Sequence, residues 1–362
     1  SAASDVYKRQ NTHYKPEFLF KASLLVKENH TWYKAFVHFG QLIEERSGGR
    51  MKLEVYPSEQ LAKELEAIRL IRAGIIDMTI SAGSLTNFSE ILTFSDMPFL
   101  LRDTIAMQKL INSFIGKRIE NEIIEKIGLR ALGYFQRGER HLTSNRPIKH
   151  PDDLDELIIR VPNAPSYVVA WKALGAKPTP MAFSEVFSSL QQGTIEAQEN
   201  PFAMIKNAGF SEVQKYLNLT GHLITWGYPL VGEKQFQRLP QDLKSIFLEA
   251  AKEMQVYEHR LFLENESKVQ AQLKKQGKIF VEVDKTAFMQ QGENAVYESL
   301  SPEMQEVHKS IKNDLINILE LYLSDLSQSI VTIVFPGPNS FPSLIAPAIL
   351  IPQLVPKLNP SF

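Results

Sequence analysis

An arginine at the end of a predicted strand, Arg160, is the residue best suited to bind a small molecule. It opens the stretch RVPNAPSYVVAWKALGAKPTPMAFSEVFSSLQQGTIEAQEN, which runs to Asn200. The strand Leu157–Val161 brings Arg160 to its carboxyl end, where ligands of open α/β sheets bind. The planar guanidinium offers paired donors that match a carboxylate. The pattern predicts an organic-acid site, although a strand-end arginine can also form a structural ion pair with a loop acid.

Other kinds of chemistry have no matching residue pattern in the sequence. The eight histidines show no metal-ligand spacing, and no glycine-rich phosphate loop follows a strand. The chain has no cysteine, which excludes disulfides, thiolate metal sites and cysteine nucleophiles. The acidic run Asp152–Glu156 lacks the glycine and the spacing of a calcium loop. The sequence therefore predicts no metal ion, no cofactor and no catalytic activity.

The first half of the chain alternates predicted strands and helices. Phe18–Leu25 reads as a strand, and Thr31 is placed to cap a helix whose apolar face repeats at helical spacing. Gly48 and Gly49 end that helix, and an alternating strand and a second helix follow. Short connections between such elements indicate parallel βαβ units. The apolar face of the first helix consists of Trp32, Phe36, Phe39 and Ile43.

A second α/β unit follows, and a long helix comes after it. Its predicted elements begin with the strand Leu129–Phe135 and include the Arg160 strand and the helices Ser166–Leu174 and Ser184–Gln191. Between Gln241 and Gln276 a helical pattern runs without a breaker until Gly277. At about 1.5 Å per residue this helix is roughly 50 Å long, which is more than one small domain requires. We expect it to cross two lobes.

Composition and charge indicate a globular protein with a local binding site. The chain has 362 residues, enough for two domains, and 44% of them are hydrophobic. Its 40 basic and 41 acidic residues give a net charge of −1, so no basic surface is available for nucleic acid or an anionic membrane. Residues 1–17 lack the apolar run of a signal peptide, and we interpret them as a disordered or non-native segment. Residues 325–362 form a Pro-rich apolar tail that we also expect to be disordered or non-native.

Seven sequence blocks follow one another along the chain: VYPSEQLAKE, RHLTSNRPI, RVPNAP, ALGAKPTPMAFSEV, LQQG, QENP and EVQKYLNLTGH. Together they resemble the substrate-binding proteins of tripartite ATP-independent periplasmic (TRAP) transporters, the DctP-like family. The resemblance spans about Phe18 to Asp314. It implies a two-lobed periplasmic-binding-protein fold, or Venus flytrap, with parallel-type sheets flanked by helices, crossover strands and a long helix spanning both lobes. The lobes are expected at 18–137 plus 226–260 and at 138–225 plus 261–320.

The resemblance assigns ligand contacts to five residues. It implies that Arg160 holds the ligand carboxylate and that Asn200 also contacts it. Arg140 is a second ligand-facing arginine, the alternative being a surface pair with Glu139. Phe183 packs on the ligand or lies in the core. Glu64 binds ligand hydroxyls, or is favoured at its helix N-terminus by the helix dipole.

Trp226 is a further candidate because it follows the crossover after Thr-Gly-His, near the predicted lobe junction. It would line the cleft or pack at the hinge. The segment Ser81–Ser84 lacks the acidic residue that sialic-acid-binding members of the family carry, so sialic acid is not expected. Glu156 occupies a position where the family commonly has glycine.

The predicted function is capture of a small organic acid and its delivery to a TRAP permease in the periplasm, by a monomer. A sugar acid such as a uronate or aldonate suits two arginines together with Glu64 and Asn200. A four-carbon dicarboxylate would use both arginines but be repelled by Glu64. An aromatic acid could use Phe183 and Trp226, and a keto acid is a further alternative. Two other classes stay open: an enzyme on a similar scaffold, and the ligand-sensing domain of a regulator.

Overall fold

The structure is a computed structural model that describes residues 15–101 and 103–314. All of these residues belong to one compact unit. The predictions for the first fourteen residues and for the Pro-rich stretch 325–362 fall outside the described part of the chain.

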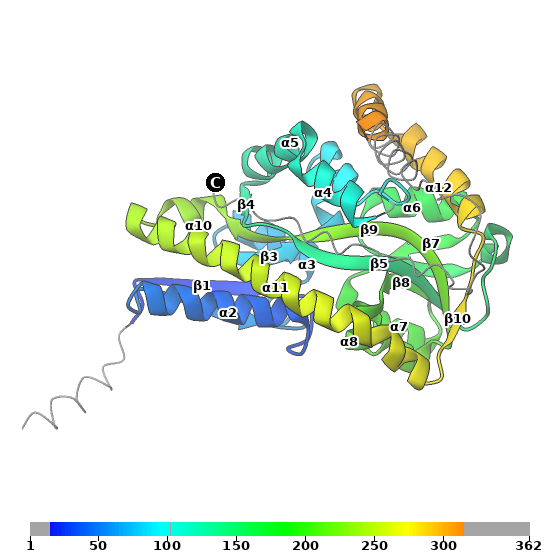
Figure 1. The fold of residues 1–362 in the computed structure, drawn as a ribbon, viewed down its shortest axis with the longest axis horizontal. Helices are drawn as coiled ribbons and strands as arrows, with labels where there is room; N and C mark the ends of the chain where they lie inside the picture. The colour runs from blue at the N-terminus through cyan, green and yellow to red at the C-terminus, as the bar shows by residue number, and fades with distance from the viewer. Residues whose placement is uncertain (1–14, 102, 315–362) are drawn as a thin grey trace, which may run out of the picture. The chain divides into compact units, whose positions relative to one another are not determined.

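The described residues form a mixed sheet in two halves (Figure 1). The strands of the first half-sheet are β1 (Phe18–Ser23), β2 (Met51–Tyr56), β3 (Met78–Ser81), β4 (Leu129–Ala131) and the end of β9 (Tyr216–Gly232). The strands of the second half-sheet are β5 (Phe135–Ser144), β6 (Ile158–Val161), β7 (Lys177–Pro180), β8 (Ala197–Pro201), β10 (Ile279–Val281) and the start of β9.

Strand order places the crossover strands in the middle of the sheet. The order is β2-β1-β3-β9-β5-β8-β6-β7, with β4 and β10 also pairing with β9. β1 runs parallel to β2 and β3, and β6 runs parallel to β7 and β8. β9 is antiparallel to β3 at its end and to β5 along most of its length. Because β9 belongs to both half-sheets, the two lobes share a continuous backbone ladder.

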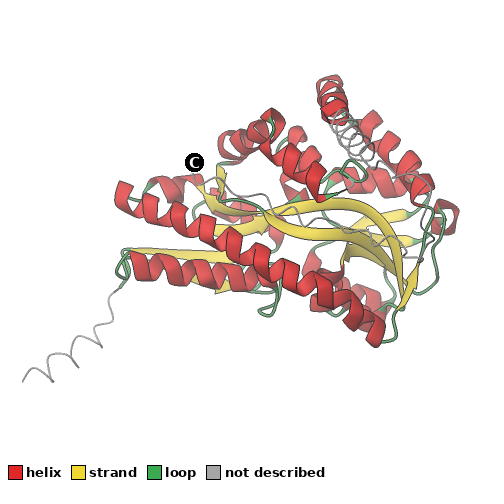
Figure 2. Cartoon of the chain, viewed as in Figure 1, coloured by secondary structure: helices red, strands yellow, loops and turns green. Residues whose placement is uncertain are grey.

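Helices cover both half-sheets (Figure 2). The α-helices are α2 (Thr31–Arg46), α3 (Glu64–Arg72), α4 (Thr104–Asn112), α5 (Phe114–Glu122), α6 (Pro165–Ala173), α7 (Val186–Gln192), α8 (Phe202–Ala208), α9 (Phe210–Val213), α10 (Glu233–Gln237), α11 (Gln241–Lys275) and α12 (Lys285–Ser299). Short 3₁₀ and π segments are η1 (Gly83–Asn87), η2 (Glu90–Ser95), η3 (Ile123–Ile127), η4 (Pro151–Leu154) and η5 (Phe183–Glu185).

The long helix α11 spans both halves, as predicted. Figure 1 shows it running from α10 at one end to α7 and α8 at the other. It packs against α2 beside the first half-sheet and against α8 beside the second. Its 35 residues match the unbroken helical pattern from Gln241 almost to the residue.

The apolar face predicted for the first helix is buried in the core. Trp32, Phe36, Phe39 and Ile43 are all buried, and the Phe39 ring meets Phe247 of α11 edge-on at 4.9 Å. Full burial of each such side chain stabilises the fold by roughly 1.5–3 kcal/mol. This packing therefore fixes α2 between β2 and α11, which brings the start of α2 to the junction of the two halves.

Several predicted boundaries are wrong, for physical reasons. His30, and not Thr31, caps α2, since its Nδ1 accepts from the Trp32 backbone N–H at 3.2 Å. The predicted strand Leu129–Phe135 is two strands, β4 and β5, because Gly133 takes a φ of 132° between them. As a result, Arg140 lies inside β5 rather than one turn beyond a strand.

Glu156 adopts the conformation of the glycine that it replaces. Its φ is 61°, in the left-handed region that most side chains avoid. The turn before β6 is therefore kept although the residue differs. Arg160 is delivered to the end of β6 as expected.

Candidate functional site

Arg160 lies at the edge of a cavity that both halves of the molecule line. The cavity has a volume of about 170 Å³, and its wall includes Glu64 and Ser84 from the first half and Arg160, Asn163 and Phe183 from the second. The Arg160 side chain is buried, and its Nε and Nη2 donate to the Met181 carbonyl at 3.0 and 2.7 Å. These bonds fix the plane of the guanidinium.

Arg160 has no carboxylate partner within ion-pair distance in the described part of the chain. Burial lowers its pKa to about 10, and the neighbouring Arg140 charge adds to that effect while Glu199 opposes it. A buried cation without a counterion is costly. An anion bound in the cavity would supply the missing charge.

Phe183 and Glu64, two of the predicted ligand contacts, line this cavity. The Phe183 ring centroid is 5.9 Å from the Arg160 guanidinium carbon, and the ring also meets Phe210 edge-on. Glu64 opens α3, and its Oε1 accepts from the Ser81 hydroxyl at 2.6 Å. Burial raises the pKa of Glu64, an effect that the Ser81 hydrogen bond opposes. The cavity thus combines a cation, an aromatic face and a hydrogen-bond acceptor.

Arg140 is buried and bound to an acid of the neighbouring strand. Its Nε and Nη2 donate to the Glu199 carboxylate at 2.5 and 2.7 Å, and Nη2 also donates to the Glu199 carbonyl at 2.9 Å. His222 Nε2 lies 2.9 Å from Glu199 Oε2. Although burial pushes the pKa of Glu199 up, Arg140 and His222 hold it at about 2. The surface pair of Arg140 with Glu139 does not form, and this guanidinium serves an internal ion pair.

Asn200 is buried in β8, near the arginines. Its Nδ2 donates to Gln198 Oε1 at 2.7 Å, and Gln198 is the register partner of Arg160 on β6. Residues two apart in a strand share a face. Asn200 therefore lies on the face of the sheet that carries Arg160, one step further toward the strand ends.

Trp226 lies in the core of the first half and does not line the cavity. Its indole is fully buried and meets the Tyr228 ring edge-on at a centroid distance of 5.8 Å. The sequence placed Trp226 correctly near the crossover. Its side chain packs at the crossover, which was the alternative to lining the cleft, because the β9 register turns it toward apolar neighbours.

A third arginine, Arg137, was missed by the sequence prediction. In a regular strand Arg137 and Arg140 would face opposite sides, since they are three residues apart. The β5–β9 register shifts between Gln136 and Glu139, and Gly138 there has a φ of 75°. A bulge of this kind re-aims side chains. An arginine followed by glycine inside a strand was the signal that could have revealed it.

Arg137 points into the same buried region as the other arginines. Burial lowers its pKa, Arg140 lowers it further, and Asp96 and Glu64 oppose the shift. Its guanidinium carbon lies 5.5 Å from the Trp32 ring centroid, and its Nε has no hydrogen-bond partner among the described residues. Three arginines and two acids therefore face one another between the halves.

Polar contacts join the two halves around the Arg160 cavity. Glu59 Oε2 accepts from the Ser184 backbone N–H at 3.1 Å, while its Oε1 accepts from the backbone N–H of Glu64. Lys63 pairs with Glu185 at 2.5 Å. On another side, Asn87 Nδ2 donates to the Asn163 carbonyl at 2.7 Å. These contacts hold the halves together over the cavity.

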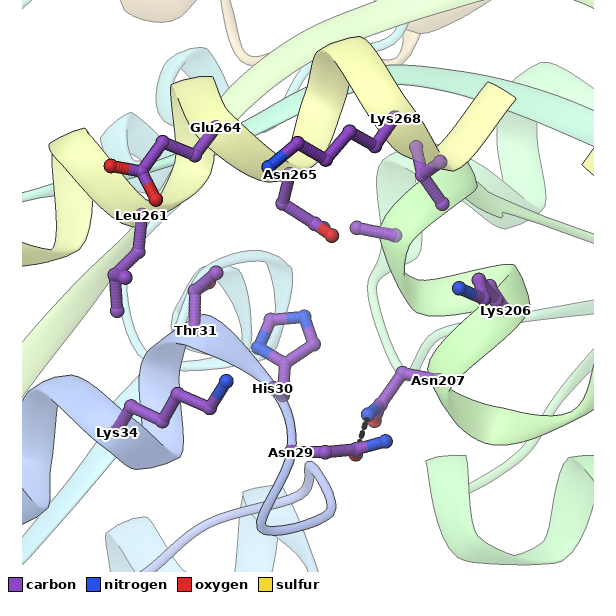
Figure 3. A pocket seen from close by; sticks show the side chains of 12 residues that line it. Asn29, His30, Thr31, Lys34, Lys206, Asn207, Leu261, Glu264, Asn265 and Lys268 are labelled. Carbon is purple, nitrogen blue, oxygen red and sulfur yellow. Dashed lines mark hydrogen bonds between the residues drawn. The ribbon is translucent and has the colours of Figure 1, made fainter. Parts of the chain in front are cut away.

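A second cavity, of about 290 Å³, lies where the start of α2 meets α8 and α11 (Figure 3). His30 Nε2 has no hydrogen-bond partner among the described residues, and burial lowers the pKa of His30 to about 3. Asn207 donates to Asn29 across this cavity, as the dashed line in Figure 3 marks. None of the six predicted site residues lines it.

Two kinds of feature are absent from the described residues. No three His, Asp or Glu side chains in residues 15–101 and 103–314 are grouped to hold a metal ion. In the same ranges, no helix combines the length and apolarity needed to cross a bilayer.

Comparison with known families decides the class of the protein. The model of the bacterial extracellular solute-binding proteins, family 7, matches residues 22–306, most of the chain. The chain belongs to this family of solute-binding proteins. As a family 7 protein it has the two-lobed fold predicted from its sequence blocks, and the family is one of transport receptors rather than enzymes.

Relatives of this family 7 protein are named for sugar acids. A TRAP periplasmic solute-binding protein of Roseobacter denitrificans, solved with bound L-galactonate, is 40% identical; the match covers 82% of this chain and 99% of that one, with a TM-score of 0.80. One from Sulfitobacter, solved with β-D-galacturonate, is 27% identical over 82% and 99%, with a TM-score of 0.78. The 2,3-diketo-L-gulonate-binding periplasmic protein of Escherichia coli is 34% identical, covering 69% of this chain and 77% of its own.

Proposed function

We propose that this protein binds a six-carbon sugar acid between its lobes and delivers it to the membrane subunits of a TRAP transporter. Arg160 carries the proposal. Its guanidinium is buried beside a cavity lined from both halves, and no carboxylate of the described residues pairs with it. A ligand carboxylate would provide a charge-assisted contact at that position.

The acids of the site favour a sugar acid over a dicarboxylate. Glu64 lines the cavity, and Asp96 faces the same arginines. A second ligand carboxylate would meet these acids, whereas ligand hydroxyls can donate to them. The ligands named for the Roseobacter, Sulfitobacter and Escherichia relatives are six-carbon acids of this kind. An aromatic acid has less support because Trp226 packs in the core.

In the proposed site, Arg160 binds the carboxylate, and Asn200 and Arg140 contribute from behind it. Arg140 acts through Glu199, whose backbone it also holds next to Asn200. Phe183 packs on the ligand, and Glu64 accepts from a hydroxyl. Trp226 supports the site from the core.

The proposed first lobe consists of residues 18–137 and 226–260. The second consists of residues 138–225 and 261–320, of which the structure describes those up to 314. The pairing of β9 supports a boundary near 226. Residues Tyr228–Val231 pair with β3 of the first half, while Tyr216–Asn218 pair with β10 of the second. We further propose that the protein acts in the periplasm as a monomer, does not convert its ligand and does not bind nucleic acid. Light scattering on the purified protein tests whether it is a monomer.

Calorimetric titration with a panel of aldonic, uronic, dicarboxylic and aromatic acids tests the function. We expect L-galactonate or another six-carbon sugar acid to bind most tightly. Arg160→Ala should weaken that binding by about 10- to 100-fold, because a hydrogen-bonded charge contributes roughly 1.5–3 kcal/mol. Arg130→Ala is the matched control, since Arg130 is already paired with Glu233 at 2.7 Å and lies outside the cavity.

Two outcomes would contradict the proposal. One is unchanged affinity in Arg160→Ala, which would remove the carboxylate assignment. The other is binding of a dicarboxylate in preference to every sugar acid, which would leave the receptor class intact but overturn the ligand class.

A further inference from the structure

Three buried polar atoms near the site have no hydrogen-bond partner among the described residues. They are Asp96 Oδ1, the Tyr167 hydroxyl and Arg137 Nε. Asp96 is 1% exposed and Tyr167 is 0% exposed. Buried polar groups are normally paired, and each unpaired one is costly. Three such atoms in one region indicate a missing hydrogen-bonding partner.

The three side chains come from different elements and meet between the halves. Asp96 follows η2 of the first half, Tyr167 lies in α6 and Arg137 in β5. Burial raises the pKa of Asp96, and the charges of Arg137 and Arg140 oppose that shift, as do the nearby hydroxyls of Thr225 and Tyr167. The Arg140 guanidinium carbon lies 5.5 Å from the Tyr167 ring centroid. The acid, the phenol and the two arginines are therefore neighbours.

Gly83 connects this cluster to the Arg160 cavity. A Cβ at Gly83 would lie 2.3 Å from Asp96 Oδ2 and 3.2 Å from the Ala164 Cβ, so the backbone of η1 packs directly on the acid. Ser84 and Asn163, the chain neighbours of Gly83 and Ala164, line the cavity beside Arg160. On each half, therefore, the residue next to the cavity-lining residue in sequence packs beside the cluster.

The chemistry of the cluster fits neutral hydroxyl groups. Asp96 has no cation within ion-pair distance among the described residues, although it faces two guanidinium groups. A second ligand carboxylate would be repelled by Asp96 and Glu64, and a ligand amine by the arginines. A hydroxyl can donate to the Asp96 carboxylate and accept from Arg137 or Tyr167 at the same time. Adjacent hydroxyls would use all three groups.

We propose that Asp96, Tyr167 and Arg137 form a subsite for the hydroxyl-bearing chain of the acid, which selects long sugar acids over short ones. This inference rests on the proposed function, because the carboxylate on Arg160 sets the register of the ligand. The carboxylate end occupies the Arg160 cavity, and the far hydroxyls extend behind its wall toward Asp96. A longer acid then forms more hydrogen bonds between its hydroxyls and the subsite, and it binds more tightly for that reason.

Two acids that share one end and differ in length test the subsite. L-Galactonate is the long probe, and L-glycerate, which has the same configuration at the carbon beside the carboxylate, keeps only the carboxylate, its neighbouring hydroxyl and one more. Asp96→Asn and Tyr167→Phe should each weaken L-galactonate binding by about 10- to 30-fold and change L-glycerate binding by less than about 3-fold. Asp77→Asn, at a half-buried acid, and Tyr228→Phe, at a buried phenol, lie in the first half outside the cavity and are the controls.

The melting temperature of the unliganded variants separates ligand binding from a structural role. Asp96→Asn and Tyr167→Phe remove a buried charge and a buried hydroxyl whose contacts are limited to each other and Thr225, so the empty variants should melt within about 4 °C of the wild type. A structural role would lower the melting temperature and weaken both acids equally, which overturns the subsite. Unchanged L-galactonate affinity also overturns it.

Failure of the proposed function has a different signature. Wild-type protein that binds neither acid, or Arg160→Ala that binds both normally, removes the carboxylate site and the subsite with it. Loss of length selection only in the Asp96 and Tyr167 variants, with Arg160→Ala weakening both acids, supports both proposals together.

Discussion

The three arginines of the site differ in what their guanidinium groups bind. Arg140 is held by the Glu199 carboxylate, Arg160 donates two bonds to the Met181 carbonyl, and Arg137 Nε has no partner among the described residues. Of the three arginines, only Arg140 has its charge neutralised within the protein, by Glu199. The remaining positive charge of Arg160 and Arg137 is available to an anionic, hydroxyl-rich ligand.

The Glu199 carboxylate is expected to contribute to stability more than to ligand selection. Glu199→Gln leaves Arg140 buried without its counterion, and breaking such a pair costs roughly 3–5 kcal/mol. Chemical denaturation at pH 7 measures this loss. Glu196→Gln, an exposed position whose Oε2 accepts from the Ile158 backbone N–H, is the control and should change stability far less. Equal effects of both variants would argue against a stabilising role of the buried pair.

At the scale of elements, a buried acid joins α11 to α2. Glu258 lies near the middle of α11, is fully buried, and its Oε1 accepts from the Thr31 hydroxyl of α2 at 3.0 Å. Its Oε2 has no partner among the described residues. Burial raises the pKa of Glu258 to about 8. The long helix therefore carries a carboxyl group that is protonated in the folded protein at neutral pH.

This pKa predicts a pH dependence of stability with a defined sign. An unfolded glutamate titrates near ~4.3, so between that value and about 8 the folded protein holds a proton that the unfolded chain has released. The stabilisation is complete at low pH and is lost as the pH rises through 8. Glu258→Gln should flatten the fall in melting temperature between pH 6.5 and 8.5. Glu249→Gln, at an exposed position of the same helix, should retain it.

Buried histidines act in the opposite direction and in another pH window. Burial lowers the pKa of His30 and of His141 to about 3, so each favours folding as the pH rises from about 3 toward ~6.5. Above pH 6.5 their contribution is constant. A steep fall that persists in Glu258→Gln above this pH would show that another group is responsible.

Elements with strong local patterns were predictable, and those shaped by tertiary contacts were not. The helix α11 and the apolar face of α2 follow from periodicity alone. β4 and β5 were merged because the break at Gly133 needs a left-handed residue between two apolar segments. Arg160 was found because it ends a short parallel strand. Arg137 was missed because only the bulge at Gly138 turns it toward Arg140.

The carboxyl groups of the site were predictable only in part. Glu64 was recognised from its sequence block, but Asp96 and Glu199 have no local signal that sets them apart from surface acids. Their burial depends on β9, which brings His222 to Glu199 and lies far along the chain. Such long-range pairing is not encoded in any short window of sequence.

At the scale of the whole molecule, contacts between the halves are expected to set the rate of ligand release. Lys63 pairs with Glu185, and Glu59 joins the start of α3 to the Ser184 backbone N–H. Lys63 and Glu185 are both half-exposed, so this pair contributes at most about 1 kcal/mol. The Lys63–Glu185 and Glu59–Ser184 contacts form only when the halves meet, and they lie at the rim of the Arg160 cavity, which Glu59 and Lys63 also line.

Glu59→Ala should therefore raise the dissociation rate of the ligand by about 3- to 10-fold with a smaller effect on association. Stopped-flow fluorescence of the liganded protein, diluted into excess competitor, measures this rate. Lys117→Ala is the control, because Lys117 pairs with Glu120 within a single helix. An unchanged dissociation rate in Glu59→Ala would show that these contacts do not limit opening.

The bulge in β5 also governs what an approaching solute meets. Arg137 lies at one register break of the β5–β9 ladder, and Arg140 borders the next. A ladder bends most easily where its register is irregular, so we expect any motion between the half-sheets to act at these two points. Arg140 is held there by Glu199, whereas the Arg137 guanidinium has no ion-pair partner among the described residues. We therefore expect a change in the angle between the lobes to move the charge of Arg137 relative to the fixed Arg140–Glu199 pair, so that the charge facing the solute depends on the state of the hinge.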